Sequence, residues 1–97
     1  MSAFIVRPLA EADVQEAFAW YEEQAQGLGH EFLRALDVCY ATIERWPESY
    51  PVVYRGFRRA LLRRFPYLVY YRAAPTGIEV VACAHGKQHP RRWRRRT

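Results

Sequence analysis

Apolar residues in the first half of the chain recur with the period of a helix in two consecutive segments. The first helix is expected to begin near Pro8, which is well tolerated at a helix start, and its apolar face is Val14, Phe18, Tyr21 and Ala25. The sequence GLG at 27–29 interrupts this helix, and Pro47 prevents continuation of the next one. The second stripe consists of Phe32, Leu36, Cys39, Ile43 and Trp46. Two helices joined by so short a break are expected to form an antiparallel hairpin.

The second half of the chain is rich in β-branched and aromatic residues, which indicates strands. Residues 67–72 and 78–85 flank the turn sequence APTG at 74–77, and this arrangement predicts a β-hairpin. A hairpin needs neighbouring strands to be stable. Residues 57–64, whose period alone fits helix or strand, are therefore expected as a third strand, and the apolar run 3–6 as a fourth.

The order of these predicted helices and strands indicates the fold class. Their order is β-α-α-β-β-β, which predicts an α+β fold with a helical hairpin on one face of a mostly antiparallel four-stranded sheet. Residues 1–97 are expected to form a single domain, with 86–97 as a basic C-terminal tail. Alternation along the last strand predicts one face carrying Ile78, Val80, Ala82 and Ala84, and another carrying Glu79, Val81, Cys83 and His85.

Composition excludes several classes of protein. The sequence has no run of eighteen apolar residues and no basic N-terminal region leading into a long apolar stretch, so a cytoplasmic protein without a membrane span or signal peptide is expected. Cys39 and Cys83 lie in apolar surroundings without CxxC spacing, which predicts buried thiols. His85 and His89 near Cys83 match no dependable zinc spacing, so neither a metal nor another cofactor is expected.

Charge is divided unevenly between the two halves of the chain. Within a net charge of +5, residues 1–50 hold three arginines against nine acidic residues, whereas residues 51–97 hold twelve basic residues against Glu79 alone. Such a division produces a one-sided field that attracts polyanions or an acidic protein partner. The alternative is that these charges serve only solubility.

A cationic surface is the first candidate site. The sheet face that the helices leave uncovered is expected to carry several of the arginines in or next to the strands, which are Arg58, Arg59, Arg63, Arg64 and Arg72. The C-terminal segment adds the candidate binding residues Lys87, Arg91, Arg92 and Trp93. The planar guanidinium group of arginine can donate two parallel hydrogen bonds to a phosphate. Tyr67, Tyr70 and Tyr71 offer aromatic rings on which nucleic-acid bases could stack. Because alternate strand residues point inwards, Tyr70 or Tyr71 is expected in the core rather than at such a site. The arginines are expected to bind, and the alternative is that they form a solvated face.

His85, at the end of the last predicted strand, is the candidate catalytic residue. Nearby positive charge favours the neutral form of a histidine, which could act as a general base towards an RNA 2′-hydroxyl while arginines hold the phosphate. The alternative is an ordinary structural hydrogen bond made by a histidine at a strand end.

Three stretches, residues 17–51, 58–72 and 78–96, resemble the RelE/ParE superfamily of bacterial toxins from type II toxin–antitoxin modules. The most recognisable pieces are Arg59, the Phe65-Pro66-Tyr67 turn leading into Tyr71, and the ending with His85, His89-Pro90, Trp93 and Arg96. The resemblance implies a small toxin with this element order, encoded beside an antitoxin that wraps and neutralises it.

The resemblance leaves two targets open. RelE-like members are ribosome-dependent mRNA endonucleases, and Arg64 and His85 fall where such nucleases carry functional groups, but the lysine-rich strand and terminal tyrosine of several of them are missing. ParE-like members poison DNA gyrase, and the two-helix portion and HPRRW ending look more like the ParE and plasmid-stabilisation branch. We therefore expect a ParE-like, growth-inhibiting toxin of DNA gyrase. The alternatives are an mRNA endonuclease with His85 and Arg64 as catalytic residues and, third, a plain nucleic-acid-binding module.

Overall fold

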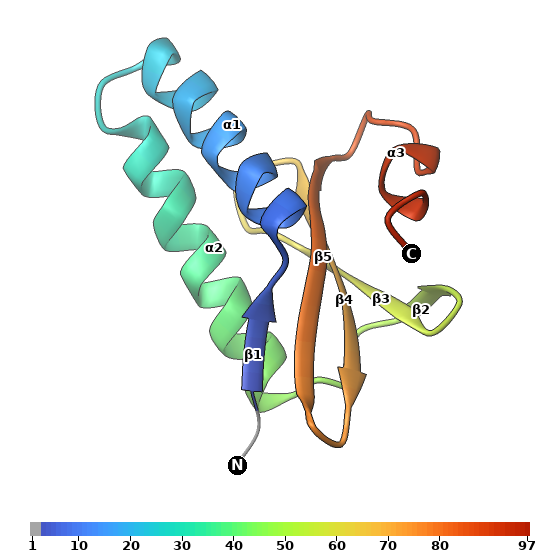
Figure 1. Ribbon diagram of the computed structural model, residues 1–97. Helices are drawn as coiled ribbons and strands as arrows, with labels where there is room; N and C mark the ends of the chain where they lie inside the picture. The colour runs from blue at the N-terminus through green and yellow to red at the C-terminus, as the bar shows by residue number, and fades with distance from the viewer. Residues whose placement is uncertain (1–2) are drawn as a thin grey trace.

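In residues 3–97, which the computed structural model describes, two long helices cover one face of a five-stranded sheet and a short helix lies on the other face (Figure 1). The helices are α1 (Pro8–Gln24), α2 (Leu28–Arg45) and α3 (Arg91–Arg94). The strands are β1 (Ala3–Val6), β2 (Val52–Tyr54), β3 (Phe57–Leu61), β4 (Tyr67–Ala74) and β5 (Gly77–His85). None of the helices in this range has both the length and the apolar character needed to cross a membrane.

The sheet has the strand order β1-β5-β4-β3-β2, and its neighbours are antiparallel except for β1 and β5, which run parallel. The α+β class and the predicted element order are confirmed. The sheet has five described strands instead of four, because the three residues of β2 turn back onto β3 through Arg55 and Gly56, both with positive φ. The strand predicted over 57–64 ends at Leu61, because Arg64 has a φ of 70° in the turn towards β4.

The turn between α1 and α2 is held by Glu22 and two glycines. The carboxylate of Glu22 accepts hydrogen bonds from the backbone N–H groups of Gly27, at 3.0 Å, and Gly29, at 2.9 Å. The bond from Gly27 is the main cause that lowers the pKa of the Glu22 carboxyl. A Cβ atom on Gly29 would lie 2.8 Å from the backbone oxygen of Phe18, so the helices approach at a distance that only glycine allows. The GLG sequence thus produces the predicted hairpin.

The main core lies between the two long helices and the sheet. The predicted stripe of α2 is buried at Phe32, Leu36, Cys39 and Ile43. Trp46 does not belong to it, since this residue follows the last turn of α2 and is 57% exposed. The face predicted for α1 is partly wrong, because Phe18 is only half-buried and Ala25 is exposed. The residues that α1 buries are Ala10, Val14, Ala17 and Tyr21.

A bulge breaks the alternation of side chains along β5. Tyr70 of β4 pairs with Ala82, and the next residue, Tyr71, pairs with Val80, so Val81 is an extra residue in β5. One extra residue moves every later side chain to the opposite face. The predicted division into two faces therefore holds as far as Val81 and is wrong from Ala82 onward. The main core receives Ile78, Val80 and Cys83, and the opposite face carries Val81, Ala82 and Ala84.

The two cysteines are buried free thiols in the main core, as the sequence predicts. Burial raises the pKa of Cys39 to about 11 and that of Cys83 to about 12. Both side chains therefore stay protonated at neutral pH, where a protonated thiol is a poor nucleophile.

Candidate functional site

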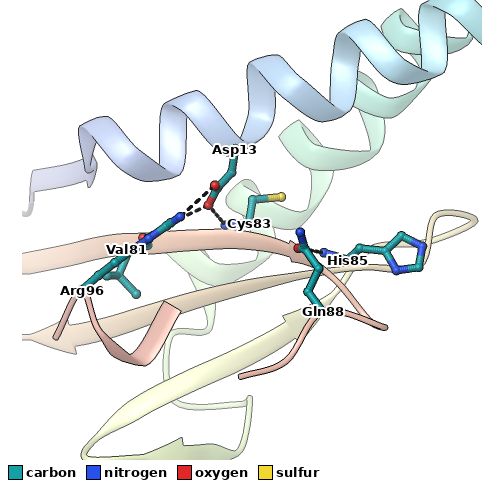
Figure 2. A network of polar contacts seen from close by, with 6 residues as sticks. All are labelled: Asp13, Val81, Cys83, His85, Gln88 and Arg96. Carbon is teal, nitrogen blue, oxygen red and sulfur yellow. Dashed lines mark hydrogen bonds and ion pairs between the residues drawn. The ribbon is translucent and has the colours of Figure 1, made fainter. Parts of the chain in front are cut away.

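His85 ends β5 and holds the turn that follows it. The Nδ1 atom of His85 accepts a hydrogen bond from the backbone N–H of Lys87 at 3.0 Å. The backbone N–H of His85 donates to Oε1 of Gln88 at 2.8 Å (Figure 2). The imidazole also lies edge-on to the ring of Tyr67, with 5.3 Å between ring centroids. His85 thus makes the structural contacts that were the alternative to a catalytic role.

A groove of about 420 Å³ opens beside His85. It is mostly apolar and is lined by Glu16, Trp20, Tyr21, Pro66, Tyr67 and His85. Among the residues that the structure describes, this lining includes a carboxylate and no arginine or lysine. A phosphate group at His85 would therefore meet a negative charge and no guanidinium in this groove.

Arg64, the predicted partner of His85, lines a different groove. Its guanidinium donates to Oε1 of Glu31 at 3.1 Å and lies 5.7 Å from the ring centroid of Phe65. The groove beside it has a volume of about 260 Å³ and lies along α2, where Arg34 and Arg63 also line it. The structure does not bring His85 and Arg64 into one site.

Arg58 is a structural residue of the sheet. Its guanidinium donates to the backbone carbonyl oxygens of Glu48, at 3.2 Å, and Tyr50, at 2.6 Å. The hydroxyl of Tyr71 donates to the carbonyl oxygen of Pro47 at 2.6 Å, so both side chains hold the connection between α2 and β2. The prediction that Arg58 joins an exposed cationic face is therefore wrong.

The sheet face opposite the long helices is partly covered by α3 (Figure 1). Trp93 is only 2% exposed and stacks on Tyr70, with ring centroids 4.1 Å apart and an interplanar angle of 20°. Tyr54 and Phe57 meet the indole edge-on or nearly so. We call this cluster the second core, which consists of Phe57, Tyr70, Val81, Ala82, Ala84 and Trp93. The tyrosines Tyr70 and Tyr71 are thus core residues, and Trp93 is not available as a surface ring.

A largely buried ion pair connects the end of the chain to α1. Both terminal nitrogens of Arg96 donate to the carboxylate of Asp13, at 2.6 and 3.0 Å, and the two side chains are only 14% and 13% exposed (Figure 2). Asp13 also accepts the backbone N–H of Cys83 at 3.0 Å, and Arg96 donates to the carbonyl oxygen of Val81 at 3.1 Å. The pairing of β5 with β1 ends at Val80. Beyond that residue, Asp13 and Arg96 therefore supply hydrogen-bond partners for two backbone groups of β5.

The remaining predicted arginines surround the second core. Arg72 lies 5.5 Å from the ring centroid of Phe57 and pairs with Glu79 at 3.1 Å, while Arg59 is exposed two residues along β3 from Phe57. Two residues that sequence reasoning missed join them, since Arg94 and Arg55 lie 4.5 and 5.2 Å from the ring centroid of Tyr54. The other predicted binding residues Lys87, Arg91 and Arg92 are exposed, and Arg92 lies beside Asp13 and Glu16.

The sequence matches the family model described as ParE toxin of type II toxin-antitoxin system, parDE, over residues 4–90. The chain belongs to this ParE toxin family. It is similar to Toxin ParE2 of two Mycobacterium tuberculosis strains, CDC 1551 / Oshkosh and ATCC 25618 / H37Rv. Identity is 28% over 81 residues in both, covering 82% of this chain and 77% of the relative. The protein is therefore a ParE-like toxin of a type II toxin–antitoxin system, with a cognate antitoxin as its partner.

The fold of this ParE toxin is similar to a solved structure titled chromosomal ParDE TA system from P. aeruginosa. The TM-score is 0.66 at 16% sequence identity, and the similarity covers 88% of this chain and 96% of the other. Together with the family match and the similarity to Toxin ParE2, this confirms the predicted RelE/ParE resemblance. The match to the family ends at residue 90, so Trp93 and Arg96 lie outside the matched range.

Proposed function

We propose that this ParE toxin inhibits growth by acting on DNA gyrase and not by cleaving mRNA on the ribosome. The contacts of His85 are the observation that favours gyrase over mRNA as the target. General-base cleavage of RNA needs a proton acceptor and cationic groups around the same phosphate. Nδ1 of His85 already accepts a hydrogen bond from the backbone N–H of Lys87. Within the described residues 3–97, those lining the groove beside the imidazole ring include Glu16 and no arginine. These contacts support a target-binding toxin of the ParE type over a nuclease of the RelE type.

The two activities are separable in a paired assay of wild type and His85→Ala. We expect wild-type toxin to inhibit gyrase supercoiling without cleaving translated mRNA, and His85→Ala to inhibit supercoiling as well as wild type does. His89→Ala is a matched control, because Nδ1 of His89 also accepts a backbone N–H, that of Arg91, at 3.0 Å. If instead wild type cleaves mRNA, His85→Ala loses about a hundredfold or more of that rate, and supercoiling is untouched, the toxin is a nuclease.

We further propose that the antitoxin docks between α2 and β3, a surface that we call the α2 groove. Two adjoining hollows of about 260 and 420 Å³ share the lining residues Ala35, Val38 and Arg63. Val38 and Leu61 are 60% and 65% exposed, although large apolar side chains are usually buried. Arg34 and Arg63 lie beside them. This combination fits an amphipathic antitoxin segment with apolar anchors and flanking acidic side chains.

Placing carboxylates in the α2 groove is expected to separate toxin from antitoxin. The double variant Val38→Glu/Leu61→Glu replaces both apolar anchoring positions with charges that repel an acidic segment. We expect the protein encoded in the adjoining reading frame to stop co-purifying with it and to stop rescuing growth, while toxicity persists. Val52→Glu alters another exposed apolar residue, on β2, and should still be neutralised. Full neutralisation of the double variant would place the antitoxin elsewhere.

A further inference from the structure

The side of the molecule that carries α3 also carries a group of guanidinium groups with little opposing charge. We call this surface the α3 face, and its residues are Arg55, Arg59, Arg72, Arg91, Arg94 and Arg95. In the sequence from 51 to 97, Glu79 is the only acidic residue, and it already pairs with Arg7 at 2.9 Å and with Arg72 at 3.1 Å. The surface therefore has excess positive charge that its own carboxylates do not neutralise.

Packing of Trp93 in the second core sets the orientation of α3 on the sheet. Trp93 points from α3 into the sheet, and successive helical residues are rotated by about 100°. Arg91 and Arg95 consequently lie about 160° from Trp93 and project away from the sheet. Arg94, on the flank of the helix, is held 4.5 Å from the ring centroid of Tyr54. Trp93 thus anchors the short helix on the sheet, and the helix turns Arg91 and Arg95 towards solvent.

The aromatic rings of the α3 face are already engaged. Trp93, Tyr70 and Phe57 are buried, and Arg72 lies against the ring of Phe57. Tyr54 has the guanidinium groups of Arg55 and Arg94 beside its ring. Proteins that hold single-stranded nucleic acids rely on free aromatic rings for stacking with bases. A duplex, by contrast, keeps its bases stacked internally and offers regularly spaced phosphates, which suit guanidinium forks.

We propose that the α3 face binds the phosphate backbone of duplex DNA without sequence preference. Arg91, Arg94 and Arg95 form the centre of the contact, and Arg55, Arg59 and Arg72 extend it across the sheet. This inference goes beyond the proposed action on gyrase, because it requires only the toxin and DNA. A toxin that holds DNA directly could contact both components of an enzyme–DNA complex at once.

Fluorescence anisotropy with purified toxin and labelled DNA tests the proposal in the absence of gyrase. The probes are two 20-base-pair duplexes of unrelated sequence and one single strand of the same length. We expect both duplexes to bind equally and more tightly than the single strand, with log K falling linearly with log salt concentration. The variant Arg91→Gln/Arg95→Gln should bind more weakly and reduce the magnitude of that slope by about two, one for each phosphate that the variant no longer neutralises.

The matched control is Arg34→Gln/Arg45→Gln, which removes the same charge from exposed positions on α2. Its affinity and salt slope for duplex DNA should stay close to wild type, and circular dichroism should be unchanged in both variants. No duplex binding at low salt, tighter binding of the single strand, or equal loss in both double variants would overturn the proposal. Gyrase inhibition is measured separately, so failure of supercoiling inhibition with intact duplex binding would count only against the gyrase proposal.

Discussion

Replacing Trp93 with alanine is expected to lower the free energy of unfolding by about 3–5 kcal/mol. The indole is almost completely buried, stacks on Tyr70, and contacts Tyr54 and Phe57. Its removal would leave a cavity in the second core and detach α3, because Trp93 is the buried residue of that helix. The loss is large for a domain of 97 residues, whose total stability is about 5–15 kcal/mol.

Urea unfolding followed by circular dichroism measures this effect. Trp93→Phe retains an aromatic ring that can stack on Tyr70, so we expect it to lose less stability than Trp93→Ala. Trp46→Ala is the matched control, since Trp46 is mostly exposed at the end of α2 and its removal should change the unfolding midpoint little. Equal midpoints for Trp93→Ala and Trp46→Ala would show that α3 adds nothing to the stability of the fold.

The helical hairpin and the central strands were predictable because their signals are local. The spacing from Phe32 to Ile43 matches the period of a helix, and the glycines at 27 and 29 allow both the turn and the close helix contact. Pro75 and Gly77 mark the turn of the β4–β5 hairpin, and a Cβ on Gly77 would lie 2.1 Å from the backbone oxygen of Ala3. The family resemblance, which was based on these segments and on the ending from His85 to Arg96, was confirmed.

The arrangement of the candidate site was less predictable, because it depends on features without a local signal. The bulge at Val81 reverses the faces of the last strand residues, and the alternation of apolar residues around it looks regular in the sequence. Trp93 stands alone among arginines, so its burial could not be inferred from any period. Arg64 was expected in the strand 57–64 and, in the nuclease alternative, in one site with His85, but it occupies a turn beside α2. In each case the residue lies in a different place from the one expected. The sequence predicted a single cationic site, whereas the structure has several separate surfaces.

The contact between Asp13 and Arg96 could not be predicted either, because 83 positions separate the two residues. Replacing Asp13 with alanine is expected to lower the free energy of unfolding by about 3–5 kcal/mol. The change would leave the largely buried guanidinium of Arg96 without a counter-charge and the N–H of Cys83 without its acceptor. Truncating one partner of a buried pair costs more than the pair itself contributes, since the remaining charge is poorly solvated.

A double-mutant cycle with Asp13→Ala, Arg96→Met and the combined variant measures this coupling by urea unfolding. We expect the combined variant to be clearly more stable than the sum of the two single losses predicts, because it leaves no uncompensated charge. Glu31→Ala, which removes the acidic partner of Arg64, is the control. Those side chains are 37% and 67% exposed, and an exposed pair contributes about 0–1 kcal/mol, reduced further by salt. Additive losses in the cycle, or a loss for Asp13→Ala no larger than for Glu31→Ala, would mean that the end of the chain is not held to α1 by this ion pair.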